Sequence, residues 1–131
     1  MEELDRLARI AVDSGFHLHK EIGPGLLESV YEILLAEELR QRGLAVRRQV
    51  VVPIRYKGVV VDNGFKVDLL VEERLLIELK SVERNAPVHG KQVLTYLRMM
   101  DLPLGLLMNF GMATFKDGLQ RVANNFDDRN R

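Results

Sequence analysis

The spacing of apolar and polar positions divides the chain into helical and extended segments. Over residues 3–20, and again over about 26–42, apolar side chains recur every three or four positions with charged residues between them. That period is typical of amphipathic helices. The run Ile22-Gly23-Pro24-Gly25 breaks the pattern between the two helices, and Gly43 marks the expected end of the second one.

From residue 45 the pattern changes to β-branched residues that alternate in part with polar ones. Residues 45–56 predict a strand, Lys57-Gly58 predicts a turn, and residues 59–62 predict the start of a returning strand. Asn63-Gly64 lies inside that return and favours either a bulge or a second tight turn. The segment therefore predicts a meander of antiparallel strands.

A second predicted hairpin carries charge inside its apolar runs. If it turns symmetrically about Glu73, Asp68 lies directly opposite Glu78, and Lys80 shares their face. Two opposed carboxylates repel each other unless a cation or an ammonium group lies nearby. The hairpin alone leaves two alternatives open: a site for Mg²⁺ or Mn²⁺, which prefer hard oxygen ligands, and a solvated face on which Lys80 neutralises both acids.

The last third of the chain predicts a helix and two short strands. The predicted elements are a helix at about 88–100 with Asn85 and Pro87 as start signals, a buried strand at 104–110, a turn at Asp117-Gly118, an edge strand at 119–122 and a polar tail at 124–131. We expect a single domain over residues 1–123, of α/β class, with a mixed sheet and helices on its faces.

Composition narrows the classes of function. The 131 residues include no cysteine, which excludes disulfides, thiolate metal sites and a thiol nucleophile. Nineteen basic and nineteen acidic residues give no net charge, which argues weakly against non-specific nucleic-acid binding. No run is long and apolar enough to span a membrane, and the first residues do not resemble a signal peptide. We therefore expect a cytoplasmic protein without a membrane partner.

Three motifs resemble those of a known group of nucleases. Asp68 followed by Glu78-Leu79-Lys80 resembles the D…ExK core of the PD-(D/E)XK nuclease superfamily. Residues 25–31, Gly-Leu-Leu-Glu-Ser-Val-Tyr, match the signature of the GxxExxY family within it. Residues 92–96 are similar to the QxxxY helix motif of RecB-type members. One departure is Val67, where many members of the superfamily have proline.

The resemblance implies a restriction-endonuclease-like α-β-β-β-α-β core with one extra N-terminal helix. It also implies metal-dependent hydrolysis of phosphodiester bonds in DNA or RNA. Asp68 and Glu78 would bind Mg²⁺ or Mn²⁺ together with the Leu79 carbonyl, and Glu28 would join them directly or through a water molecule. Lys80 would orient the attacking water or neutralise the developing negative charge.

The resemblance further implies that Gln92 and Tyr96, one helical turn apart, border the site and position the substrate, with His89 beside them. Purely structural explanations of these residues remain open. On the predicted helix at 88–100, Tyr96 would pack and Gln92 would face water. Glu28 would be a first-turn acid that the helix dipole favours.

Fold alone does not fix function, so two other readings stand beside the nuclease. One is a non-catalytic nucleic-acid-binding or regulatory protein on a nuclease fold. The other is a small structural partner protein, for example a homodimer that uses the apolar surface of the first helix.

Overall fold

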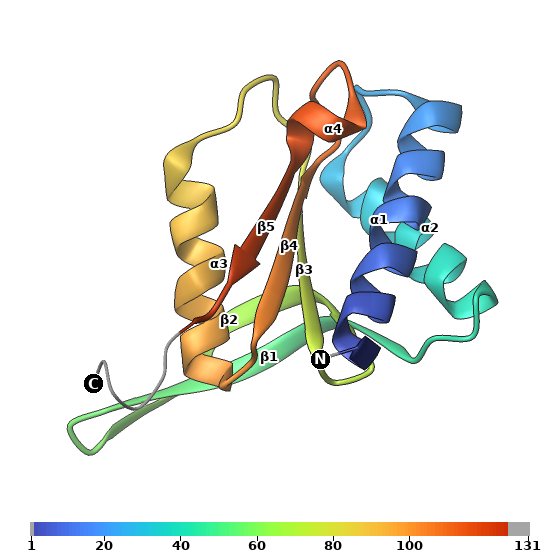
Figure 1. Ribbon diagram of the computed structural model, residues 1–131. Coiled ribbons are helices and arrows are strands. Elements are labelled where there is room, and N and C mark those ends of the chain that lie inside the picture. The colour runs from blue at the N-terminus through green and yellow to red at the C-terminus, as the bar shows by residue number, and fades with distance from the viewer. Residues whose placement is uncertain (1, 126–131) are drawn as a thin grey trace.

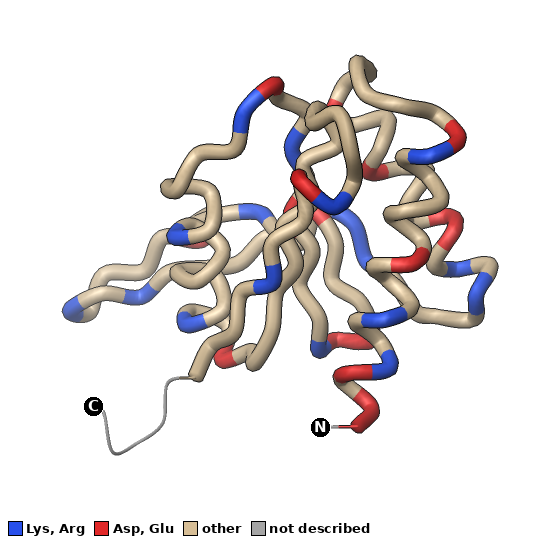
Figure 2. Tube along the Cα trace, turned by 45° about the horizontal axis from the view of Figure 1, so that its top comes forward, with Lys and Arg blue, Asp and Glu red and all other residues tan. Residues whose placement is uncertain are grey.

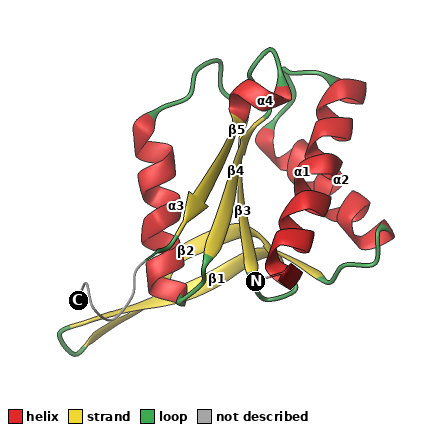
Figure 3. Ribbon diagram, viewed as in Figure 1, coloured by secondary structure: helices red, strands yellow, loops and turns green. Residues whose placement is uncertain are grey.

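A five-stranded sheet lies between two helical layers (Figures 1 and 3) in the computed structural model, which describes residues 2–125. Helices α1 and α2 cover one face of the sheet and α3 covers the other. In chain order the elements are α1 (Glu2–Ile22), α2 (Glu28–Gln41), β1 (Val46–Tyr56), β2 (Val59–Val71), β3 (Leu75–Lys80), α3 (Pro87–Met100), β4 (Leu104–Asn109), α4 (Phe115–Gly118) and β5 (Leu119–Ala123).

The strands follow one another across the sheet in the order β1-β2-β3-β4-β5. The pairs β1–β2, β2–β3 and β4–β5 are antiparallel, whereas β3 and β4 are parallel and are joined through α3. From α2 to β4 this gives the expected α-β-β-β-α-β core, and α1 is the additional N-terminal helix. The predicted mixed-sheet fold class is therefore confirmed.

Two apolar clusters hold the layers together. Leu7 of α1 and Leu35 of α2 pack with Ile77 of β3 on one face of the sheet. Val93 and Leu97 of α3 belong to a second cluster on the other face. Each fully buried aliphatic side chain contributes roughly 1.5–3 kcal/mol. Because both clusters use the same sheet, the two layers depend on each other.

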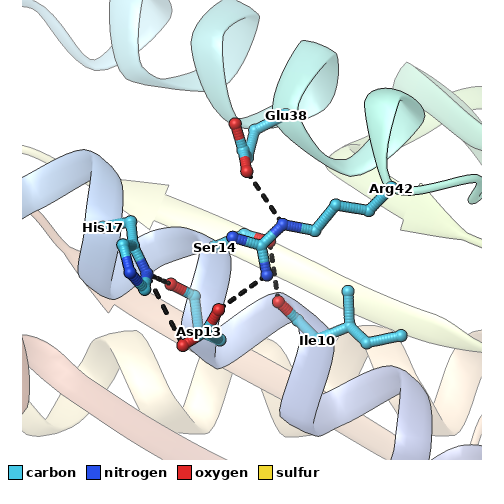
Figure 4. A network of polar contacts seen from close by, with 6 residues as sticks. All are labelled: Ile10, Asp13, Ser14, His17, Glu38 and Arg42. Carbon is cyan, nitrogen blue, oxygen red and sulfur yellow. Dashed lines mark hydrogen bonds and ion pairs between the residues drawn. The ribbon is translucent and has the colours of Figure 1, made fainter.

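Polar contacts also join α1 to α2 (Figure 4). The Arg42 guanidinium at the end of α2 donates to Asp13 Oδ2 at 2.7 Å and to Glu38 Oε2 at 2.8 Å. His17 Nδ1 lies 2.8 Å from the backbone carbonyl oxygen of Asp13. These charged side chains are partly or largely exposed, so each ion pair contributes little to the stability of the fold.

The β1–β2 hairpin extends past the rest of the sheet as an arm (Figure 1). Its register shifts between Val52 and Ile54, so that residues 62–64 of β2 lie opposite Pro53 alone. Gly64 belongs to this bulge, and a Cβ atom there would lie 2.5 Å from the Ile54 side chain. The bulge is thus the alternative that the structure adopts at Asn63-Gly64, and β2 continues through it.

Three local predictions need correction. Helix α2 begins at Glu28 and not near residue 26, because Leu27 is extended. Asn85 does not cap α3: the helix begins at Pro87, after Ala86, without a side-chain cap. Asp117-Gly118 forms the end of α4 instead of a simple turn. Of the predicted polar tail, residues 126–131 lie outside the described part of the chain.

Candidate functional site

The site forms where β2 and β3 separate. Their pairing runs from Val71 opposite Leu75 to Leu69 opposite Ile77, which confirms the predicted register. Glu72 and Glu73 in the turn both have positive φ, and the Arg74 amide donates to the Val71 carbonyl. The next positions along the two strands are Asp68 and Glu78.

Each of these two acids binds the backbone of the opposite strand. Glu78 Oε1 accepts the Asp68 amide at 2.9 Å, and Asp68 Oδ2 accepts the Leu79 amide at 2.9 Å. The carboxylates thus take hydrogen bonds that a continuous ladder would give to carbonyl groups. This reciprocal pair keeps both side chains in the gap between the strands.

Glu78 is strongly perturbed by this position. The residue is only 5% exposed. Burial, and then the neighbouring Asp68 carboxylate, raise the pKa of Glu78 to about 8. Lys80 acts in the opposite direction but does not outweigh them. Without another cation, the pair therefore holds a proton near neutral pH.

Glu28 faces the same group of charges from the first residue of α2. Burial and the Asp68 carboxylate raise the pKa of Glu28, while Lys80 lowers it. A first-turn acid that felt only the helix dipole would shift the other way. The charges of Asp68 and Lys80 thus act on Glu28 as well as on Glu78.

The loop before α2 is fixed by Tyr31. Its side chain is fully buried and stacks on Phe110 with ring centroids 4.6 Å apart. Its hydroxyl donates to the Gly23 carbonyl and accepts the Leu26 amide at 3.2 Å. This is the expected packing role with a hydrogen-bonded hydroxyl. A groove of about 550 Å³ opens between this loop, Glu28 and Ser81.

Helix α3 brings one of its predicted site residues to the acids. Tyr96 stacks on Phe65, with ring centroids 4.1 Å apart, and burial together with the charges of Glu78 and Asp68 raises the pKa of Tyr96. Gln92 and His89 are half-buried on the same helix. Among residues 2–125, no hydrogen bond or ion pair joins their side chains to the acids.

Two polar residues at the site were missed from the sequence. Glu32 is 4% exposed, and its carboxylate accepts from Arg48 Nε at 3.1 Å and from Gln49 Nε2. The Gln49 amide also donates to Asp68 Oδ1 at 3.2 Å. The i, i+4 spacing of Glu28 and Glu32 was the available signal, because like charges at that spacing destabilise a helix.

The strand arginines near the site are already paired. Arg48 binds Glu32, and Arg47 binds Glu73 with an N–O distance of 2.7 Å. Arg55 and Lys57 lie further along the arm, and neither is ion-paired to a carboxylate in the part of the chain that the structure describes. Figure 2 shows basic positions along the outer part of the β1–β2 hairpin.

The donor set suits a hard divalent cation. Asp68 and Glu78 offer carboxylate oxygens in the gap between β2 and β3, and they repel each other when both are charged. Residues 2–125 contain no group of three or more Asp, Glu or His side chains gathered to bind a metal. Mg²⁺ commonly binds through one or two carboxylates, with water and substrate phosphates as the other ligands. Two opposed acids fit that pattern.

Comparison with known proteins agrees with the fold. The model of the PD-(D/E)XK nuclease superfamily matches residues 5–122, which include all or most of every strand and helix from α1 to β5. The chain therefore belongs to the PD-(D/E)XK nuclease superfamily. No curated protein matches it significantly. No helix within the described residues is long and apolar enough to cross a membrane.

Proposed function

We propose that the protein is a metal-dependent nuclease that hydrolyses phosphodiester bonds of DNA or RNA. The observation that carries this proposal is the pair of buried Glu78 and half-buried Asp68, joined across diverging strands and followed two residues later by Lys80. Membership of a nuclease superfamily supports it. Within that superfamily, we assign the chain to the GxxExxY group on Gly25, Glu28 and Tyr31.

Asp68 and Glu78 would hold Mg²⁺ or Mn²⁺, with the Leu79 carbonyl and with Glu28 directly or through water. When bound, the ion supplies a Lewis acid and a source of activated water beside the phosphate. The positive charge of Lys80 lowers the pKa of both Glu78 and Glu28, so it acts on the carboxylates of the site. That charge stabilises the phosphate as its oxygens gain negative charge.

Helix α3 and the loop before α2 would position the substrate. The charges of Glu78 and Asp68 act on the Tyr96 phenol, which supports a place for it beside the acids. Gln92 and His89 lie on the same helix and would contact the nucleotide beside the cleaved bond. The groove along Glu28 and Ser81 offers room for the chain that leads away from the site.

The test is cleavage by the purified protein in Mg²⁺, in Mn²⁺ and in EDTA, on single- and double-stranded DNA and RNA. We expect Asp68→Asn and Lys80→Met each to reduce cleavage at least 100-fold, because each removes a charge that the transition state needs. Asp101→Asn and Lys20→Met remove the same charges at exposed positions and should cleave like the parent. Full activity of both site variants would overturn the assignment.

The absence of a three-ligand group within residues 2–125 is the observation that favours the alternative, a non-catalytic nucleic-acid-binding or regulatory protein. Calorimetric titration with Mn²⁺ separates the two. A nuclease should bind the ion in a manner that depends on Asp68 and Glu78, whereas a scaffold that only binds nucleic acid should not.

A homodimer and a cytoplasmic location stay predictions. Sedimentation of the protein at micromolar concentration tests the first of them, since a single species of 15.0 kDa would exclude the dimer.

A further inference from the structure

Gln49 has a backbone conformation that its position in β1 does not explain. The flanking residues Arg48 and Val50 pair regularly with Leu69 and Val67 of β2. Gln49 itself has φ +52°, the left-handed region that favours glycine, and it does not pair with Asp68, the residue across from it. A strained residue of this kind persists only where its surroundings hold it, and such residues often lie at functional sites.

The side chain of Gln49 gives a reason for the strain. Its single amide nitrogen donates to two carboxylates, Glu32 Oε1 and Asp68 Oδ1. Both partners are acceptors, so the amide nitrogen, and not the amide oxygen, must face them. The left-handed backbone of Gln49 therefore places its side-chain amide between Glu32 of α2 and Asp68 of β2.

Glu32 is held in turn from its other side. It is 4% exposed, and its second carboxylate oxygen accepts from Arg48 Nε at 3.1 Å. Both oxygens of this buried acid are thereby satisfied, which fixes the plane of the carboxylate. Arg48 and Gln49, neighbours in β1, thus hold Glu32 in place. The Gln49 amide that binds Glu32 also binds Asp68, so the position of Asp68 depends on that of Glu32.

Asp68 is consequently bound at both oxygens, by Gln49 at 3.2 Å and by the Leu79 amide at 2.9 Å. We propose that Gln49, anchored by Glu32, is a positioning residue that sets the orientation of the Asp68 carboxylate for divalent-cation binding. The inference rests on the proposed function. Partners of metal-binding carboxylates typically affect metal affinity by 10- to 100-fold.

A purely structural role is the competing explanation, because the same contacts tie α2 to β1. Gln49→Gly separates the two. Glycine adopts φ +52° without strain, and this gain opposes the cost of leaving one Glu32 oxygen without its amide donor, so the variant should keep a cooperative fold. It removes the amide, however, and should weaken Mn²⁺ binding about tenfold in calorimetric titration.

Asp101→Gly is the matched control. Asp101 also has a positive φ, +56°, but it caps the far end of α3 and is exposed. It should bind Mn²⁺ like the parent. Gln49→Asn tests rescue, because asparagine tolerates the left-handed backbone and keeps the amide on a shorter side chain. It should recover part of the affinity that Gln49→Gly loses.

The outcomes distinguish this inference from the proposal on which it rests. Tenfold weaker Mn²⁺ binding by Gln49→Gly, with cooperative urea unfolding retained, supports the positioning role. Unchanged Mn²⁺ affinity overturns that role alone, even if the variant is less stable. A parent protein that binds no Mn²⁺ overturns the proposed metal site, and the positioning role with it.

Discussion

Glu78 makes the stability of the metal-free protein depend on pH. Its pKa is raised to about 8 in the folded state by burial and by Asp68, whereas the unfolded side chain titrates near its ordinary value. The folded state therefore binds the proton more tightly. The stabilisation is fully present below the unfolded pKa and is lost as pH rises through about 8. We expect the free energy of unfolding to fall between pH 5 and pH 8, by up to about 1.4 kcal/mol per pH unit.

Urea unfolding in EDTA at constant ionic strength measures this dependence. Glu78→Gln keeps the shape and can still accept the Asp68 amide, but it does not titrate. The free energy of unfolding of Glu78→Gln should change much less between pH 5 and pH 8. At pH 9 the variant should be more stable than the parent. An unchanged slope in Glu78→Gln would assign the pH dependence to other groups.

At the same scale, the sequence predicted some contacts and missed others for a physical reason. Asp68 opposite Glu78 followed from a local turn about Glu73, which the register of the hairpin confirms. Glu32 and Gln49 meet only because α2 packs over β1, a contact between segments 17 residues apart. Nothing in the β-branched run around Gln49 indicates a left-handed residue.

Among the elements, the β1–β2 arm has a tip that extends past the rest of the sheet and is exposed. Tyr56 at its tip is 69% exposed, and the Lys57 ammonium lies 5.4 Å from the centre of that ring. Phe65 at its base stacks on Tyr96, which links the arm to the site. A basic arm with an exposed aromatic ring suits contact with nucleic-acid phosphates and bases.

We therefore expect Arg55→Gln/Lys57→Gln to weaken nucleic-acid binding in EDTA and to reduce the slope of log Kd against log salt by about two. Fluorescence anisotropy over a salt series measures both quantities. Arg9→Gln/Lys20→Gln removes the same two charges from exposed positions on α1, and should bind like the parent. Equal weakening of the two double variants would mean that net charge, and not the arm, governs binding.

The elements also show where local sequence signals are sufficient. Periodicity and β-branched runs predicted the order of helices and strands. Asn63-Gly64 indicated either a bulge or a second tight turn, and the register shift shows that it is a bulge. The start of α2 was placed too early, because the apolar residues Leu26 and Leu27 extend the helical pattern into an extended loop. That loop is set by the Tyr31 hydroxyl, which reaches back to Gly23 and Leu26. Such a tertiary contact has no periodic signature.

At the scale of the whole molecule, ion binding between β2 and β3 should stabilise the entire fold. The two apolar clusters share β2 and β3, the strands that carry Asp68 and Glu78. We expect the domain to unfold cooperatively, so an ion that binds only the native state stabilises all of it. Mn²⁺ at 100 times its Kd should add about 2.7 kcal/mol to the free energy of unfolding.

The stabilisation of the fold by Mn²⁺ should also depend on pH, because the ion must displace the proton held near Glu78. The pKa of about 8 makes that displacement costly at pH 6 and cheaper at pH 8. Thermal unfolding with and without Mn²⁺ should therefore show a larger rise in Tm at pH 8 than at pH 6. Asp68→Asn should lose the rise at both pH values, and Asp101→Asn should keep it. If Asp68→Asn is stabilised as much as the parent, the ion binds elsewhere, and the pair between the diverging strands is only a protonated structural contact.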